Sequence, residues 1–122
     1  MDVYAYVRER GKLTPMSAEP FRHIPEVLCT WDMSKSAAGQ GNSFRGLPYQ
    51  VFIKQTTGVD LKQEQISERR VLKMSEALTA LRNIPKAPAS CSEYGLNPTE
   101  VNALIDWFEV VAKHRGVVVV WW

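Results

Sequence analysis

Both ends of the 122-residue sequence have the pattern of β-strands. Residues 2–7 alternate, with small apolar side chains at the odd positions and polar or tyrosine side chains at the even ones, as in a strand with one buried face. Residues 117–122, Val-Val-Val-Val-Trp-Trp, have no polar alternation, which is typical of a strand in the middle of a sheet. We therefore expect these two strands to lie near each other in one small sheet. Residues 26–31 also alternate and are a candidate for a further strand.

The segment Leu47–Thr57 fits either a helix or a strand, because it combines high strand propensity with apolar residues at helical spacing. We choose the helix for its ends. Pro48 suits a first helical turn, and Gly58 suits the left-handed position that follows a last turn. Residues 67–84 have a clearer helical period, with Ser67 as a candidate cap, and the helix should end before the next proline.

The third predicted helix, residues 97–115, has the best-defined start. Asn97 can cap it, and Pro98 and Glu100 complete a sequence that resembles a capping box. Gly116 is expected to end it. Trp107 neighbours the apolar stripe and is expected at the edge of the core. The stripe itself consists of Val101, Leu104, Ile105, Phe108, Val111 and Ala112.

Two stretches are predicted to be irregular. Charges, one glycine and three prolines break any period between residues 8 and 25, so most of this stretch should run over the surface. Residues 34–46 contain three glycines and three serines and are the most loop-like part of the chain. The pattern predicts one α+β domain over residues 1–122, in which the N- and C-terminal strands form a small sheet and about three helices pack largely on one face.

The composition argues against two classes of partner, nucleic acid and membrane, but does not identify the partner. Fifteen Lys and Arg against thirteen Asp and Glu give a net charge of +2, which is too small to indicate nucleic acid. The longest apolar run has six residues, far fewer than a membrane span needs, so no membrane partner is expected. Cys29 and Cys91 form no CxxC pair, and their redox state stays open. Because no secretion signal is evident, we expect a cytoplasmic protein.

No catalytic motif is recognisable, so we assign no catalytic residue. The sequence lacks HxxxH, HExxH and calcium-loop spacings, and we expect neither metal nor cofactor. A nucleophilic pair of His23 and Cys29 would need a geometry that sequence proximity does not supply, and a buried structural cysteine is the commoner outcome. His114 is explained by the last turn of its helix. Whether the protein is an enzyme therefore stays open.

By elimination we expect a non-enzymatic, protein-binding module. The kind that we favour is a small bacterial immunity protein or inhibitor that blocks a toxin or an enzyme. Aromatic and arginine side chains are favoured at interfaces, which selects the candidate partner-binding residues. These are Phe44, Arg45, Arg69, Arg70 and Trp122.

Two alternative functions would involve some of these residues. The Gly39–Gly46 loop with Arg45 could hold a phosphate or another small ligand at the start of the next helix. A basic helix face containing Arg69, Arg70 and Lys73 could bind nucleic acid weakly, although nearby glutamates dilute its charge.

Overall fold

The predicted α+β class is confirmed by the structure, a computed structural model. The structure describes residues 2–17, 19–24, 42–63, 65–83, 95–96 and 98–121. Within these residues the chain forms an antiparallel sheet of five strands together with three α-helices. The candidate strand 26–31 and both cysteines lie outside the described residues.

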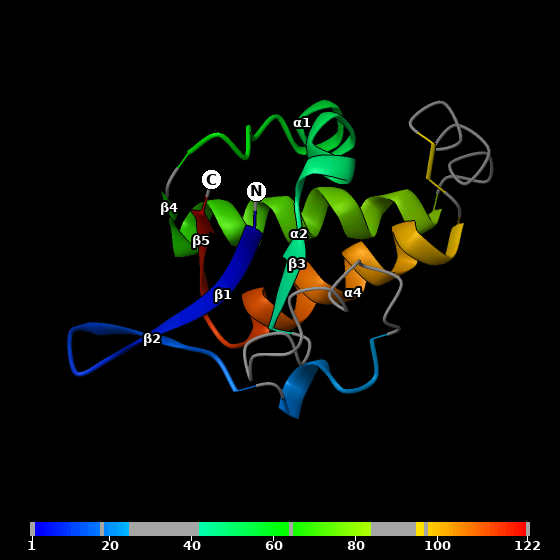
Figure 1. Cartoon of the computed structure of the whole chain (residues 1–122). Helices are drawn as coiled ribbons and strands as arrows, with labels where there is room; N and C mark the ends of the chain where they lie inside the picture. The colour runs from blue at the N-terminus through cyan, green and yellow to red at the C-terminus, as the bar shows by residue number, and fades with distance from the viewer. Residues whose placement is uncertain are drawn as a thin grey trace.

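The strands at the two ends of the sequence are adjacent, as predicted. Strand β1 (Asp2–Glu9) runs antiparallel to β5 (Val117–Trp121), with Asp2 opposite Trp121 (Figure 1). The other edge of β5 pairs with β4 (Gln65–Ile66), so β5 is an interior strand. Val117, Val118 and Val120 are buried, Val119 is partly buried, and Trp121 at the end of the strand is exposed, so β5 is buried on its inner face and only in part on its outer face.

A β-hairpin occupies part of the stretch that we expected to run irregularly over the surface. Strand β2 (Lys12–Pro15) pairs with the second half of β1 through a two-residue turn at Arg10 and Gly11. Both turn residues have positive φ, 53° and 79°, as in the turns that match the twist of a hairpin. The sequence did not reveal this turn because an arginine stands where asparagine or glycine is usual.

The segment expected to be the most loop-like ends in a strand. Strand β3 (Ser43–Arg45) pairs with the first half of β1, on the same edge that β2 uses further along. Asn42 joins the two edge strands: its carbonyl accepts the Ala5 N–H at 2.9 Å, and its side-chain amide donates to the Met16 carbonyl at 2.8 Å. As a result, Phe44 is only 2% exposed and belongs to the core.

The helix chosen for the ambiguous segment is confirmed. A 3-10 turn, η4 (Leu47–Tyr49), leads into α1 (Gln50–Thr57), and Gly58 follows with a φ of 77°. The next helix, α2 (Glu68–Ala80), begins as predicted, with the Ser67 hydroxyl accepting the Arg70 N–H at 3.4 Å. Two further 3-10 turns, η1 (Glu19–Phe21) and η5 (Leu81–Asn83), complete the described helical elements.

The end of helix α4 (Pro98–Lys113) differs from the prediction in one detail. Arg115, not Gly116, takes the left-handed position, with a φ of 55°. The Arg115 N–H donates to the Ala112 carbonyl and the Gly116 N–H to the Val111 carbonyl, which is the Schellman arrangement. Gly116 is needed for space, because a Cβ there would lie 2.6 Å from the Val111 Cγ1.

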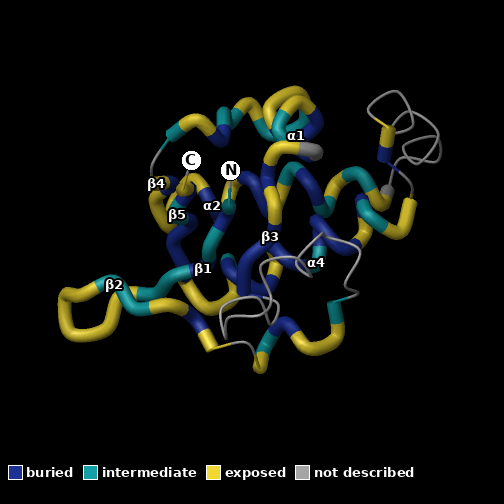
Figure 2. The backbone as a smooth tube through the Cα atoms, viewed as in Figure 1, coloured by how far each residue is buried: buried dark blue, intermediate teal, exposed yellow. Residues whose placement is uncertain are grey.

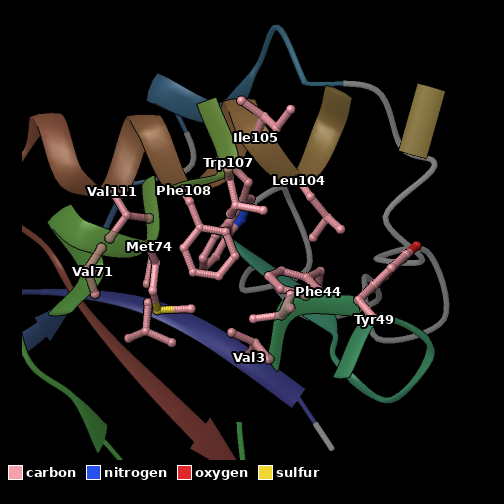
Figure 3. Close-up of a cluster of buried hydrophobic side chains, with 14 of the residues drawn as sticks. Val3, Phe44, Tyr49, Val71, Met74, Leu104, Ile105, Trp107, Phe108 and Val111 are labelled. Atoms are coloured by element: carbon pink, nitrogen blue, oxygen red, sulfur yellow. The ribbon is translucent and has the colours of Figure 1, made fainter. Parts of the chain in front are cut away.

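Helices α2 and α4 pack against each other behind the sheet (Figure 1), and Figure 2 shows buried stretches on both helices and on the strands in front of them. The core centres on Trp107, which is fully buried and not at the edge as expected. Its ring centroid lies 4.8 Å from that of Phe44, 5.0 Å from Phe108 and 5.7 Å from Phe21. Figure 3 shows Phe44 pointing from β3 into this cluster. Strand β3 thus contacts α4 through aromatic side chains.

Candidate functional site

The outer face of the sheet, turned away from α2 and α4, is the first candidate surface. Directly opposite residues in neighbouring strands share a face, and successive residues alternate between faces. The inner face, which contains Val3, Ala5, Val118 and Val120, is buried. The outer face of the two central strands includes Tyr4, Tyr6, Val117, Val119 and Trp121, with Asp2 and Arg8 further along β1, and of these Val117 is buried.

The outer face carries aromatic side chains, with Asp2 and Arg45 near one end of β1 and Arg8 toward the other. Trp121 is 58% exposed, and Tyr4 and Tyr6 are half-buried. Asp2 lies opposite both Trp121 and Arg45. Partial burial raises the pKa of the Tyr4 hydroxyl, and the negative charge of Asp2 raises it further. Tyr4 therefore stays neutral over the physiological range and presents a hydroxyl that can donate a hydrogen bond.

The second candidate surface is a solvent-open hollow of about 680 Å³, which we call the basic groove. Its cationic lining residues come from β1, from the start of α2 and from the end of α4: Arg8, Arg69, Lys113 and Arg115. Glu68 is the carboxylate among the described lining residues. Arg8 follows Tyr6 two residues along β1 and therefore lies on the same face, so the groove borders the outer face of the sheet.

The cations of the basic groove have no acidic partner in the described part of the chain. The ion pairs found there involve Arg22, Lys54 and Arg82 instead. Within the part of the chain that the structure describes, the side chains of the four groove cations form neither a hydrogen bond nor an ion pair. The described lining therefore has a net positive charge, with four cations and the one carboxylate of Glu68.

The five residues that the sequence selected for partner binding do not come together. Phe44 is buried, and Arg45 is exposed on the outer face of the sheet. Arg69 lines the basic groove, whereas Arg70 donates to the Gln63 side chain at 2.6 Å. Trp122 lies outside the described residues.

Four further residues join the candidate sites through the fold: Tyr4, Tyr6, Arg8 and Arg115. Tyr4 and Tyr6 alternate with the buried side of β1, so the pattern that predicted the strand also identified its outer face. Arg8 and Arg115 are far apart in sequence, and no local pattern joins them. Only the antiparallel pairing of β1 with β5 brings them to one groove.

Of the basic helix face proposed for nucleic acid, Arg69 and Lys73 are exposed on α2, and Arg70 donates to the Gln63 side chain. Arg82 forms an ion pair with Asp106 of α4 and lies 3.9 Å from the Glu109 carboxylate. Arg82 is therefore neutralised within the fold. Of the alternative phosphate loop, residues 39–41 lie outside the described residues, and Arg45 belongs to a strand.

The described residues contain no cluster of three or more His, Cys, Asp or Glu side chains that could hold a metal ion. His114 is bonded within its helix, with Nδ1 2.9 Å from the Val110 carbonyl. His23 is exposed, and its suggested partner Cys29 lies outside the described residues. None of the described helices combines the length and the apolar character that crossing a membrane requires.

Comparison with known proteins gives no relative from which a function could be transferred. No family model matches the chain, and no similar protein was found among curated sequences or solved structures.

Proposed function

We propose that the protein is a non-enzymatic binding module whose partner is another protein, and that this partner docks on the outer face of the sheet. The observation that carries the proposal is the exposure of Trp121, which is 58% accessible beside two half-buried tyrosines. A solvated sheet face normally carries polar residues, so an aromatic one favours a partner.

The composition of this face matches the centre of a protein interface. Tyrosine, tryptophan and arginine are the residue types that most often dominate binding energy, and here they are Tyr4, Tyr6, Trp121 and Arg45. Charged residues are depleted at the core of such interfaces, and Arg45 and Asp2, which are opposite each other in the β1–β3 register, lie at one end of the aromatic group.

The backbone of the proposed interface is held in place before binding. Tyr4 and Val119 are paired across β1 and β5, and the β5 side of this pair is supported by Gln65 of β4. A surface on an interior pair of strands loses little conformational entropy when a partner docks, which favours affinity.

Affinity capture from a lysate of the source cells tests the proposal. Three tagged proteins are compared: the wild type, a Tyr6→Ser/Trp121→Ser variant and a Val51→Ser control. Val51 is 61% exposed on α1, so its replacement removes a similar exposed apolar side chain away from the sheet. We expect one stoichiometric protein with the wild type and the control, and its loss with the double variant. Equal recovery by all three proteins would contradict the proposed surface.

The narrower hypothesis of an immunity protein or inhibitor needs a second measurement. If the captured partner is an enzyme or a toxin, adding the purified wild-type protein should abolish its activity, and the Tyr6→Ser/Trp121→Ser variant should not. A partner whose activity is unchanged in the complex would support a binding module and contradict an inhibitor.

A further inference from the structure

The basic groove concentrates charge that the fold itself does not use. Arg8, Arg69, Lys113 and Arg115 line one hollow, with Glu68 as the opposing carboxylate among the described lining residues. None of the four cations is in an ion pair within the described residues. Like charges gathered around one hollow repel one another, so folding alone gives no reason to collect them.

Two of these cations also occupy positions that local structure disfavours. Arg69 lies in the first turn of α2, two residues after the Ser67 cap, where the positive end of the helix dipole repels a cation. Arg115 has a left-handed backbone, with a φ of 55°, at a position where glycine is the more stable residue. Lys113, in contrast, lies in the last turn of α4, where the negative end of the helix dipole favours a cation.

We infer that the basic groove is a binding site for a small phosphorylated molecule. Guanidinium groups pair with phosphate through two parallel hydrogen bonds, and three arginines with one lysine suit a multiply charged phosphate ester. The volume of about 680 Å³ lies within the range of small-molecule sites. Leu72, Ala112 and Val117 supply apolar surface for the organic part of the ligand.

The groove suits a small ligand better than a nucleic acid. Single-stranded nucleic acids are usually held by bases stacked on aromatic side chains, and the described lining of the groove contains no aromatic residue. Arg82, which follows α2, is paired with Asp106, so it does not extend the positive charge beyond the end of the helix. The inference concerns a different surface from the proposed protein interface and does not depend on it.

Titration calorimetry at about 150 mM salt tests the inference, with pyrophosphate and adenosine diphosphate as probes. We expect saturable binding of one molecule per chain and a matching rise in the unfolding temperature. The informative variant is Arg115→Gly, which removes one cation and also relieves the left-handed backbone. It should unfold at the same or a higher temperature than the wild type, and its affinity for both probes should fall by about tenfold or more.

Arg10→Gly is the matched control, because Arg10 also has positive φ, 53°, but lies in the β1–β2 turn and does not line the groove. Its affinity should equal that of the wild type, as should that of Trp121→Ser, which tests the other surface. Absence of saturable binding by both probes would overturn the inference. So would equal weakening by Arg10→Gly, or tighter binding of hexaglutamate or decathymidylate than of adenosine diphosphate.

Discussion

Replacing Phe44 by alanine should lower the free energy of unfolding by about 3–5 kcal/mol, the usual effect of removing a fully buried phenylalanine. The side chain is 2% exposed, so burial of its apolar surface alone contributes about 1.5–3 kcal/mol. Its ring also lies against three others, with centroid distances of 4.8 Å to Trp107, 5.8 Å to Tyr49 and 6.2 Å to Phe108. Each such pair contributes about 0.5–1.5 kcal/mol more, of which the remaining rings recover part by relaxing.

Urea unfolding followed by circular dichroism and tryptophan fluorescence measures this loss, which should lower the midpoint without changing the slope. The melting temperature should fall by roughly 10–20 °C. Leu47→Ala is the control, because Leu47 is 64% exposed only three residues away, and its effect should stay within about 0.5 kcal/mol. A loss of less than about 1 kcal/mol for Phe44→Ala would show that this segment is the surface loop that its composition suggests.

Three further substitutions test other details of the fold. Gly116→Ala places a Cβ 2.6 Å from the Val111 Cγ1 and should lower the unfolding free energy by about 1–3 kcal/mol; an unchanged melting curve would contradict the close approach. Ser67→Ala should lower it by about 1 kcal/mol, whereas Ser67→Gly should lower it by only a few tenths; equal losses would argue against a hydroxyl cap. The Lys62 N–H donates to the Asp60 carboxylate at 2.9 Å and lowers the pKa of that carboxyl below its ordinary value of 3.8. The charged carboxylate therefore stabilises the folded state at neutral pH, and this contribution is lost as the pH falls through the lowered pKa. Asp60→Asn should therefore be less stable than the wild type at pH 7 and approach it in urea titrations below pH 3.8; a constant difference would refute the linkage.

Local signals in the sequence were sufficient for the elements that depend on a few neighbouring residues. The alternation in β1, the serine cap of α2 and the glycine after α1 each act within one strand or one turn. What the sequence could not supply depends on pairing between distant segments. Phe44 follows a run of glycine and serine, and only its position opposite Val3 brings it into the core.

The same limit applies to the candidate sites. Arg69 was selected from the sequence for its charge, but its neighbours in the groove, Arg8 and Arg115, are separated from it by dozens of residues and by two strand pairings. The end of α4 shows a subtler limit. The sequence correctly predicted that the helix ends at residues 115–116. That Arg115 takes the left-handed backbone, and Gly116 does not, follows from how closely Gly116 approaches β1.

The pairing of β1 with β5 also fixes the order in which the sheet can be completed. These strands contribute the central pair, yet Asp2 and Trp121 are separated by nearly the whole sequence. The β1–β2 hairpin closes over a two-residue turn and can form early, whereas the central pair requires one of the longest loop closures that the chain allows. Until β5 docks, the inner edge of β1 stays open to pairing with another chain. Refolding should therefore be slow for a domain of this size and should become prone to aggregation as the protein concentration rises.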